Sequence, residues 1–139
     1  MTTVVAITGG IGSGKSTFSK EVKKRGLSLL DSDEEVGKIY NNPTKKFFEY
    51  LNKIKLNQAI KGTKIDKKII SNIIFSNPQI KSKLEDYIFK IVREKRNKFI
   101  KREKKKKTKT IFLDIPLLLE NHLEKDFDIV ISIISKKKQ

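Results

Sequence analysis

The feature that most constrains the fold is a glycine-rich segment, GGIGSGKS at residues 9–16, placed directly after a short apolar run at residues 4–7. The apolar run holds two valines, an alanine and an isoleucine, which is typical of a strand buried in a parallel sheet. From Lys15 the apolar spacing becomes helical, with Phe18 and Val22 four residues apart. A buried strand, a glycine-rich turn and a helix in this order predict the start of a parallel α/β sheet.

The same segment matches the phosphate-binding pattern G-x-x-x-x-G-K-[ST] at every defined position. Glycines let the backbone approach phosphate oxygens, and the N-terminus of the following helix favours anions. We therefore expect Lys15 to reach the β- and γ-phosphates of ATP and the Ser16 hydroxyl to ligate Mg²⁺. The predicted ATP-binding residues are Gly10, Ile11, Gly12, Ser13, Gly14, Lys15, Ser16 and Thr17. The alternative is a glycine-rich turn that binds nothing.

Three aspartates follow predicted strands. They are Asp31 and Asp33 after residues 27–30, and Asp114 after residues 110–113. Ligands of an open parallel sheet bind at the carboxyl ends of its strands. Phosphoryl transfer needs a carboxylate that orients the acceptor hydroxyl, which suits Asp33 or Asp31, and one that holds Mg²⁺, which suits Asp114. The alternatives are helix capping for the first two and an ordinary turn for Asp114.

The remaining pattern alternates strands with helices and contains one long helical stretch. Helices are predicted over residues 34–40, 44–60, 66–75 and from Pro78 through Phe99, and a fourth strand over residues 128–134. Asp66 is the predicted cap of the third of these helices. The alternation favours a parallel sheet covered on both faces. We expect a single domain over residues 1–139, with a helical insertion over residues 34–107.

Composition excludes several kinds of site. The chain has no cysteine and one histidine, which excludes disulfides, thiolate metal sites and histidine-cluster metal sites. Its apolar runs are shorter than the roughly 20 residues that a membrane span needs. The N-terminus lacks the pattern of a signal peptide, so we expect a cytoplasmic protein without a membrane partner.

The formal net charge of +16, from 32 basic and 16 acidic residues, attracts polyanions. Residues 93–107 carry much of this charge, which is typical either of a nucleic-acid surface or of a solvated helix face in a lysine-rich protein. Aromatic residues are sparse in this stretch, with Phe99 the only one. We therefore favour the solvated face and expect no specific nucleic-acid partner.

Four ordered segments resemble the dephospho-CoA kinases. They are ITGGIGSGKST at residues 7–17, DSD at residues 31–33, FSNP at residues 75–78 and DIPLLLEN at residues 114–121. The resemblance implies a P-loop kinase-type three-layer α/β/α fold that transfers the γ-phosphate of ATP to the 3′-hydroxyl of dephospho-CoA. It implies that Asp33 accepts or orients the proton of that hydroxyl. It also implies that the CoA side comprises residues 33–51 and the helices before Phe99.

The sequence departs from the family pattern at two places and in length. Phe89 and Lys90 stand where the family usually has a His-Pro pair, and Gly37 stands where it usually has a basic residue. Family members continue beyond the position of Gln139 with an arginine-bearing lid, a last strand and a helix. We expect a sheet of order 2-3-1-4 that lacks the fifth strand, which leaves the fourth strand at an edge.

The sequence leaves several functions open. The first is phosphorylation of dephospho-CoA, with Lys15 and Asp33 as catalytic residues and Ser16 and Asp114 as Mg²⁺ ligands. The second is a truncated, inactive fragment that still binds the nucleotide. The third is another P-loop small-molecule kinase, and the fourth is a basic ATPase that binds nucleic acid. The sequence predicts no oligomeric state.

Overall fold

The computed structural model describes residues 1–10, 12–115 and 127–134. The chain divides into two compact units. Unit 1 comprises Met1–Asp33 and Lys95–Gln139, and unit 2 comprises Glu34–Glu94. Two helices, α2 (Ser32–Asn41) and α5 (Pro78–Lys105), contribute residues to both units.

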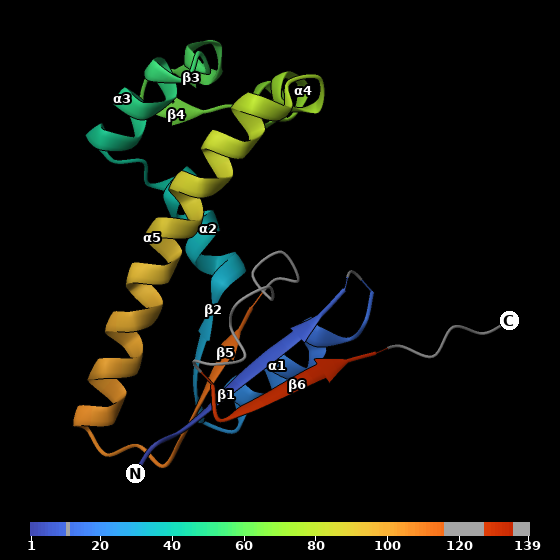
Figure 1. Cartoon of the computed structure of the whole chain (residues 1–139), viewed down its shortest axis with the longest axis vertical. Coiled ribbons are helices and arrows are strands. Elements are labelled where there is room, and N and C mark those ends of the chain that lie inside the picture. The colour runs from blue at the N-terminus through green and yellow to red at the C-terminus, as the bar shows by residue number, and fades with distance from the viewer. Residues whose placement is uncertain (11, 116–126, 135–139) are drawn as a thin grey trace, which may run out of the picture. The chain divides into compact units, whose positions relative to one another are not determined.

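Within its described residues, unit 1 is built on a four-stranded parallel sheet (Figure 1). Its strands are β1 (Thr3–Gly9), β2 (Ser28–Asp31), β5 (Thr110–Asp114) and β6 (Ile129–Ile133). The strand order is β2-β5-β1-β6, which confirms the predicted order 2-3-1-4. Each predicted strand matches its observed counterpart closely, because short β-branched runs bounded by turn residues mark strands well.

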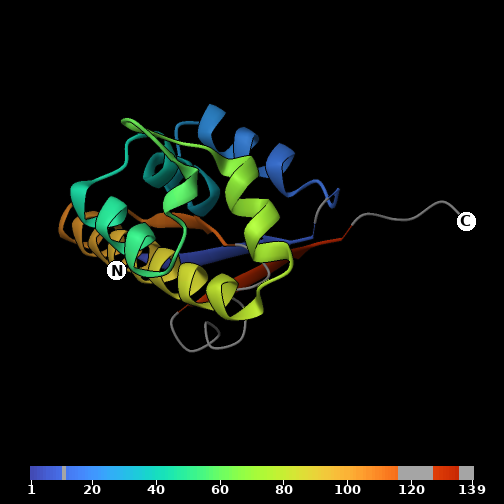
Figure 2. The same ribbon diagram turned by 90° about the horizontal axis from the view of Figure 1, so that it is seen from above.

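Alternating side chains divide the sheet into two apolar faces. On one face Val4, Ala6, Ile111 and Leu113 pack with Phe99 of α5. The opposite face is covered by α1 (Lys15–Lys24), whose buried residues include Val22. Figure 2 shows α1 along one side of the strands. The predicted covering of both faces is therefore confirmed, and burial of these aliphatic side chains is the main stabilising contribution to unit 1.

The strand β6 lies at one edge of the described sheet, as expected for the fourth strand. Within the described residues it pairs with β1 alone. The side chains of Ile129 and Val130 are half-exposed, whereas most residues of the central strand β1 are buried.

A buried carboxylate joins the end of α5 to the start of β2. Glu103 is 5% exposed and accepts hydrogen bonds from Ser28 Oγ at 2.6 Å and Thr108 Oγ1 at 3.4 Å. Lys106 Nζ lies 3.5 Å from its other oxygen. The hydrogen bond from Ser28, with support from the charge of Lys106, lowers the pKa of Glu103 although burial opposes this. The carboxylate is therefore ionised and supports the fold at neutral pH.

Unit 2 is mainly helical. Besides its parts of α2 and α5 it contains α3 (Lys45–Lys53), η1 (Asn57–Ala59), β3 (Ile60–Lys61), β4 (Lys64–Ile65) and α4 (Lys67–Phe75). Its core includes the fully buried Phe47, Leu51 and Leu56. Tyr50 and Tyr87 stack with ring centroids 4.2 Å apart, and Tyr87 also stacks on Phe47.

The prediction of one helix over residues 44–60 is wrong. The helix α3 ends at Lys53, and Lys55 takes a left-handed conformation with φ 68°. The Leu56 N–H then donates to the Leu51 carbonyl, which closes the helix end. The chain continues through η1 into the hairpin β3–β4, where a loop was expected. Phe47, Leu51 and Ile54 keep helical spacing. Leu56 and Ala59 also reach the core, but from η1 and the residue before it, so extending the helical pattern to residue 60 was wrong.

The start signals of the later helices are confirmed. Asp66 Oδ1 accepts from the N–H groups of Lys68 and Ile69, so it caps α4 as predicted. The start of α5 is capped in a similar way, because Asn77 Oδ1 accepts from the Ile80 N–H. Pro78 is the first residue of α5, the position at which proline fits a helix best.

Candidate phosphate-binding site

The glycine-rich loop runs from the end of β1 to the start of α1, as predicted. Gly12 and Gly14 take left-handed conformations with φ 77° and 93°, which a side chain would strain. The Ser13 N–H donates to the Gly10 carbonyl at 3.1 Å, so the chain turns tightly over these residues. The glycines at these positions are therefore required by the backbone of the loop itself.

Gly9 is required for a different reason, the closeness of its neighbours. A Cβ atom at this position would lie 2.6 Å from Ser13 Oγ and 2.9 Å from the Ile133 carbonyl oxygen. Ser13 Oγ is itself buried and has no hydrogen-bond partner within the part of the chain that the structure describes. A buried hydroxyl without a partner in a tight loop is a group that a bound anion would satisfy.

The helix α1 presents an uncapped N-terminus to this loop. Its N-cap residue is Gly14, which has no side chain to accept from the first N–H groups, and its first turn holds no acidic residue. The first N–H groups of a helix lack partners within it and carry the positive end of the helix dipole. Ser16 and Thr17 expose their side chains in this turn. The helix start is thus suited to a phosphate group.

Lys15 and Asp114 form an ion pair beside the loop. Lys15 Nζ lies 2.9 Å from Asp114 Oδ1, and the two side chains are 11% and 4% exposed. The other oxygen, Oδ2, accepts a hydrogen bond from Ser19 Oγ at 2.6 Å. In the parallel register Asp114 lies opposite Ile7 of β1 and Asp31 of β2, so it stands at the carboxyl ends of the central strands.

The two other predicted aspartates have different positions. Asp31 is the last residue of β2, and its Oδ1 accepts from the Asp33 N–H at 2.9 Å. Asp31 thus takes the capping position at the start of α2. Asp33 is the second residue of α2, and its carboxylate is exposed. Of the two carboxylates, Asp33 is the one that the start of α2 presents to solvent.

The donors near the loop fit a magnesium ion better than a metal bound by protein alone. Among residues 1–10, 12–115 and 127–134, no group of three or more histidine, aspartate or glutamate side chains is placed to hold a metal. Mg²⁺ usually takes one or two protein oxygens together with substrate phosphates and waters. The carboxylate of Asp114 and the hydroxyl of Ser16 are oxygen donors of this kind.

Sequence reasoning missed Ser19. The only sequence signal for it is its position four residues after Lys15, which places both on one face of α1. Two parts of the predicted site, Ile11 and the segment 116–121, lie outside the described residues.

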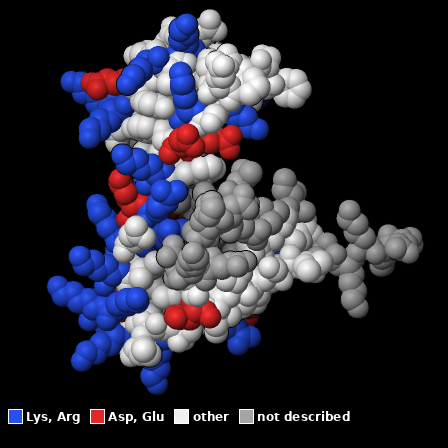
Figure 3. All heavy atoms as spheres, in the orientation of Figure 1, with Lys and Arg blue, Asp and Glu red and all other residues white. Residues whose placement is uncertain are grey.

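The basic stretch forms an exposed face on α5 and the turn after it. Lys101, Lys104, Lys105 and Lys107 all expose their side chains, and Figure 3 shows blue side chains gathered along this region. The two functional interpretations of this face remain predictions. Although α5 has 28 residues, neither it nor any other helix in the described part of the chain is long and apolar enough to cross a membrane.

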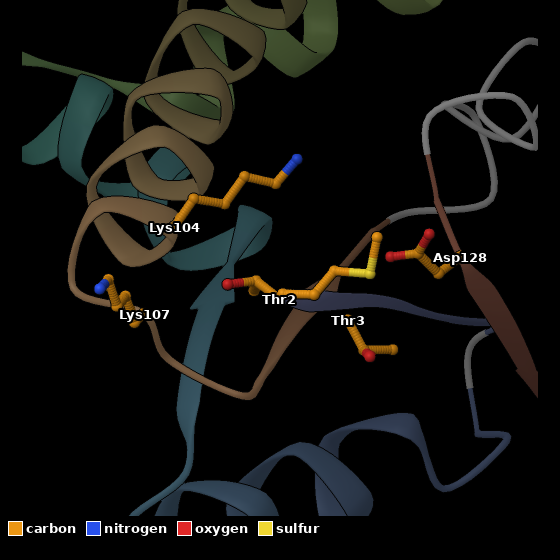
Figure 4. Close-up of a pocket in the computed structure, with 6 residues that line it drawn as sticks. Thr2, Thr3, Lys104, Lys107 and Asp128 are labelled. Carbon is orange, nitrogen blue, oxygen red and sulfur yellow. The ribbon is translucent and has the colours of Figure 1, made fainter.

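Apart from the glycine-rich loop, a hollow of about 540 Å³ lies beside this basic face, at the amino ends of β1 and β6. It is lined by Met1, Thr2, Thr3, Lys104, Lys107 and Asp128 (Figure 4). Two of its polar groups already have backbone partners: Asp128 Oδ2 accepts from the Val4 N–H, and Thr2 Oγ1 donates to the Thr108 carbonyl. This hollow lies at the amino ends of the strands and not at the phosphate loop.

Comparison with known proteins identifies relatives over the whole chain. The chain is 34% identical over 131 residues to a dephospho-CoA kinase of Bartonella henselae, which covers 94% of this chain and 65% of the relative. It is 32% identical over 144 residues to a dephospho-CoA kinase of Streptococcus agalactiae, which covers all of this chain and 71% of the relative. The chain therefore spans about two thirds of the length of these relatives.

Two solved structures have the same fold. A dephospho-CoA kinase of Campylobacter jejuni superposes with a TM-score of 0.74 at 27% identity, over 94% of this chain and 66% of the other. A Thermus thermophilus protein superposes with a TM-score of 0.75 at 25% identity, over 96% and 66%. The family model described as dephospho-CoA kinase matches residues 3–139. The sequence, the sheet order and these matches agree, and the chain belongs to the dephospho-CoA kinase family.

Proposed function

We propose that this chain binds ATP at the phosphate loop and transfers its γ-phosphoryl group to the 3′-hydroxyl of dephospho-CoA. The observation that carries the proposal is the juxtaposition of Lys15, Asp114 and the uncapped start of α1, in a chain that the dephospho-CoA kinase model matches from residue 3. A cation, a buried carboxylate and free N–H groups are the groups that phosphoryl transfer uses.

In this proposal the loop binds the phosphates of ATP. The N–H groups of Lys15, Ser16 and Thr17 at the start of α1 donate to phosphate oxygens, and Lys15 leaves Asp114 to neutralise the β- and γ-phosphates. Ser13 Oγ, which is buried and unpartnered within the described residues, gains a partner when the anion binds. Asp114 and Ser16 would hold Mg²⁺, which when bound offsets the negative charge of the phosphates.

Asp33 is the proposed partner of the acceptor. Its exposed carboxylate accepts the proton of the 3′-hydroxyl as the ribose oxygen forms its bond to the γ-phosphorus. The bond from that phosphorus to the β–γ bridging oxygen breaks, and ADP leaves with the electron pair. Asp31 is the weaker candidate for this role, because its Oδ1 already accepts from the Asp33 N–H and it is less exposed than Asp33.

Product formation tests the proposal directly. The purified chain is incubated with Mg²⁺, ATP and dephospho-CoA, and CoA is detected by mass spectrometry. We expect CoA from the unaltered chain, and at least about 100-fold less from Asp33→Asn, because general-base contributions have this size. Glu21→Gln, which alters an exposed carboxylate on α1 outside the proposed CoA side, is the matched control and retains activity.

Two results would count against the proposal in different ways. ATP binding without CoA would leave a nucleotide-binding protein and remove the transfer step. CoA formed equally well by Asp33→Asn would remove Asp33 from the mechanism. Competition by other nucleosides and small hydroxyl compounds distinguishes dephospho-CoA from the acceptors of other P-loop kinases.

A further inference from the structure

The two carboxylate oxygens of Asp114 have separate partners on one helix. Oδ1 lies 2.9 Å from Lys15 Nζ, and Oδ2 accepts from Ser19 Oγ at 2.6 Å. Within the described residues, Lys15 is therefore the ionic partner of this carboxylate and the Ser19 hydroxyl is its hydrogen-bond donor. Asp114 and Ser19 are both 3% exposed, so water does not replace either contact.

The helical spacing explains why one helix reaches both oxygens. Lys15 and Ser19 are four residues apart in α1 and therefore lie on the same face, towards the end of β5. The lysine side chain is long and flexible, whereas the serine hydroxyl is short and fixed close to the helix backbone. One partner of Asp114 is thus able to leave while the other stays.

We propose that Ser19 is a positioning residue that holds Asp114 in place while Lys15 exchanges the carboxylate for phosphate. The inference rests on the proposed function, because it assumes that Lys15 binds the phosphates of ATP. When Lys15 leaves, Asp114 remains a buried charge, which is costly unless another group compensates it. The Ser19 hydroxyl retains one partner for Asp114 and keeps Oδ1 oriented towards the loop, where a cation that accompanies the phosphates is able to bind.

The test compares ATP binding in two conditions, with EDTA and with increasing Mg²⁺, by calorimetry on the whole chain. In Ser19→Ala, ATP binding in EDTA weakens, because breaking the Lys15 pair then leaves Asp114 with no partner from α1. Added Mg²⁺ should strengthen ATP binding. In Ser19→Ala, the Mg²⁺ concentration at which half of this increase in affinity is reached rises about tenfold or more, as is usual when a residue that supports a metal ligand is removed. Ser19→Cys, which keeps the shape but donates poorly, replaces the alanine variant if the latter does not fold.

Two further variants separate positioning from stability. Val22→Ala removes buried volume from the same helix, so it lowers the unfolding temperature without changing the Mg²⁺ requirement. Asp114→Asn removes the negative charge that Ser19 compensates when Lys15 leaves, so adding Ser19→Ala to it has no further effect on ATP binding in EDTA. This lack of additivity is the signature of a residue that acts through its partner.

The possible failures are distinguishable. If the unaltered chain does not bind ATP, the proposed function and this inference are both overturned. If it binds ATP and Ser19→Ala has the same Mg²⁺ requirement, only the role of Ser19 is overturned. The role is also overturned if Ser19→Ala weakens binding equally in the Asp114→Asn background, or if Val22→Ala raises the Mg²⁺ requirement to the same extent.

Discussion

Removing the Lys15 amine should destabilise the nucleotide-free protein as well as prevent ATP binding. The ion pair of Lys15 with Asp114 is almost fully buried, with 2.9 Å between Nζ and Oδ1. Loss of one partner of a buried pair leaves an uncompensated charge and costs about 3 kcal/mol or more. For a chain of this length, Lys15→Met should therefore lower the unfolding temperature by about 10 °C.

The two halves of the pair should not be equivalent. Asp114→Asn leaves Lys15 without its partner, but a lysine extends its flexible side chain into water. The new amide still accepts from Ser19, so this variant should lose only about 1 kcal/mol. The double variant Lys15→Met with Asp114→Asn should recover part of the loss of Lys15→Met, because it no longer buries a lone charge.

Urea unfolding followed by far-ultraviolet circular dichroism measures these differences without any nucleotide. The expected order of stability is unaltered chain, Asp114→Asn, then Lys15→Met. If the free energy of unfolding of Lys15→Met lies within about 0.5 kcal/mol of that of the unaltered chain, this would falsify the stabilising role of the buried ion pair, since surface pairs contribute only this much. The two variants that lack Lys15 should show no measurable ATP binding, so the contact that stabilises the fold also belongs to the proposed site.

Three further predictions concern other parts of the molecule. Gly9→Ala should weaken ATP binding and lower the free energy of unfolding by about 1–3 kcal/mol, because the new Cβ would meet the Ile133 carbonyl oxygen. An unchanged urea midpoint and an unchanged ATP affinity would show that the loop adapts to the extra atom. Glu103 has a lowered pKa in the folded state, so its stabilising effect is present at neutral pH and is lost as the pH falls below its ordinary value near 4.5. Glu103→Gln should therefore lower the unfolding temperature more at pH 7 than at pH 3, and an equal loss at both would contradict the role of the charge. Leu51→Ala should lower the free energy of unfolding of unit 2 by about 2–5 kcal/mol. Tyrosine fluorescence follows this unfolding, because Tyr40, Tyr50 and Tyr87 all lie in unit 2.

Local sequence patterns determined the parts of the molecule that depend on neighbouring residues. The phosphate loop was predictable because its glycine positions match backbone conformations that other residues avoid, as φ 93° at Gly14 illustrates. Asp66 was predictable as a helix cap because its carboxylate accepts from N–H groups two and three residues ahead. The strands were predictable from apolar runs, and the family resemblance came from short motifs of the same local kind.

The ending of α3 and the roles of the two neighbouring aspartates were harder to predict. The apolar residues of segment 44–60 have nearly helical spacing, yet the helix ends before the left-handed Lys55. Leu56 and Ala59 still pack into the core, but the backbone that carries them is not part of α3. By position after a predicted strand, Asp31 and Asp33 had equal claims, and the family resemblance favoured Asp33. The observed start of α2 distinguishes them, because it turns the carboxylate of Asp31 back onto the backbone.

Only the tertiary structure decided how the acidic partner of the loop is held. Ser19 and Asp114 are 95 residues apart in the chain and meet because β5 inserts beside β1 in the parallel sheet. Glu103 and Ser28 are 75 residues apart and meet for a similar reason. The sequence specifies which side chains are able to donate or accept, but strand order and register decide which of them share a buried position. That physical distinction is why the sequence predicts Lys15 as a phosphate ligand but did not predict Ser19 as the hydrogen-bond donor to Asp114.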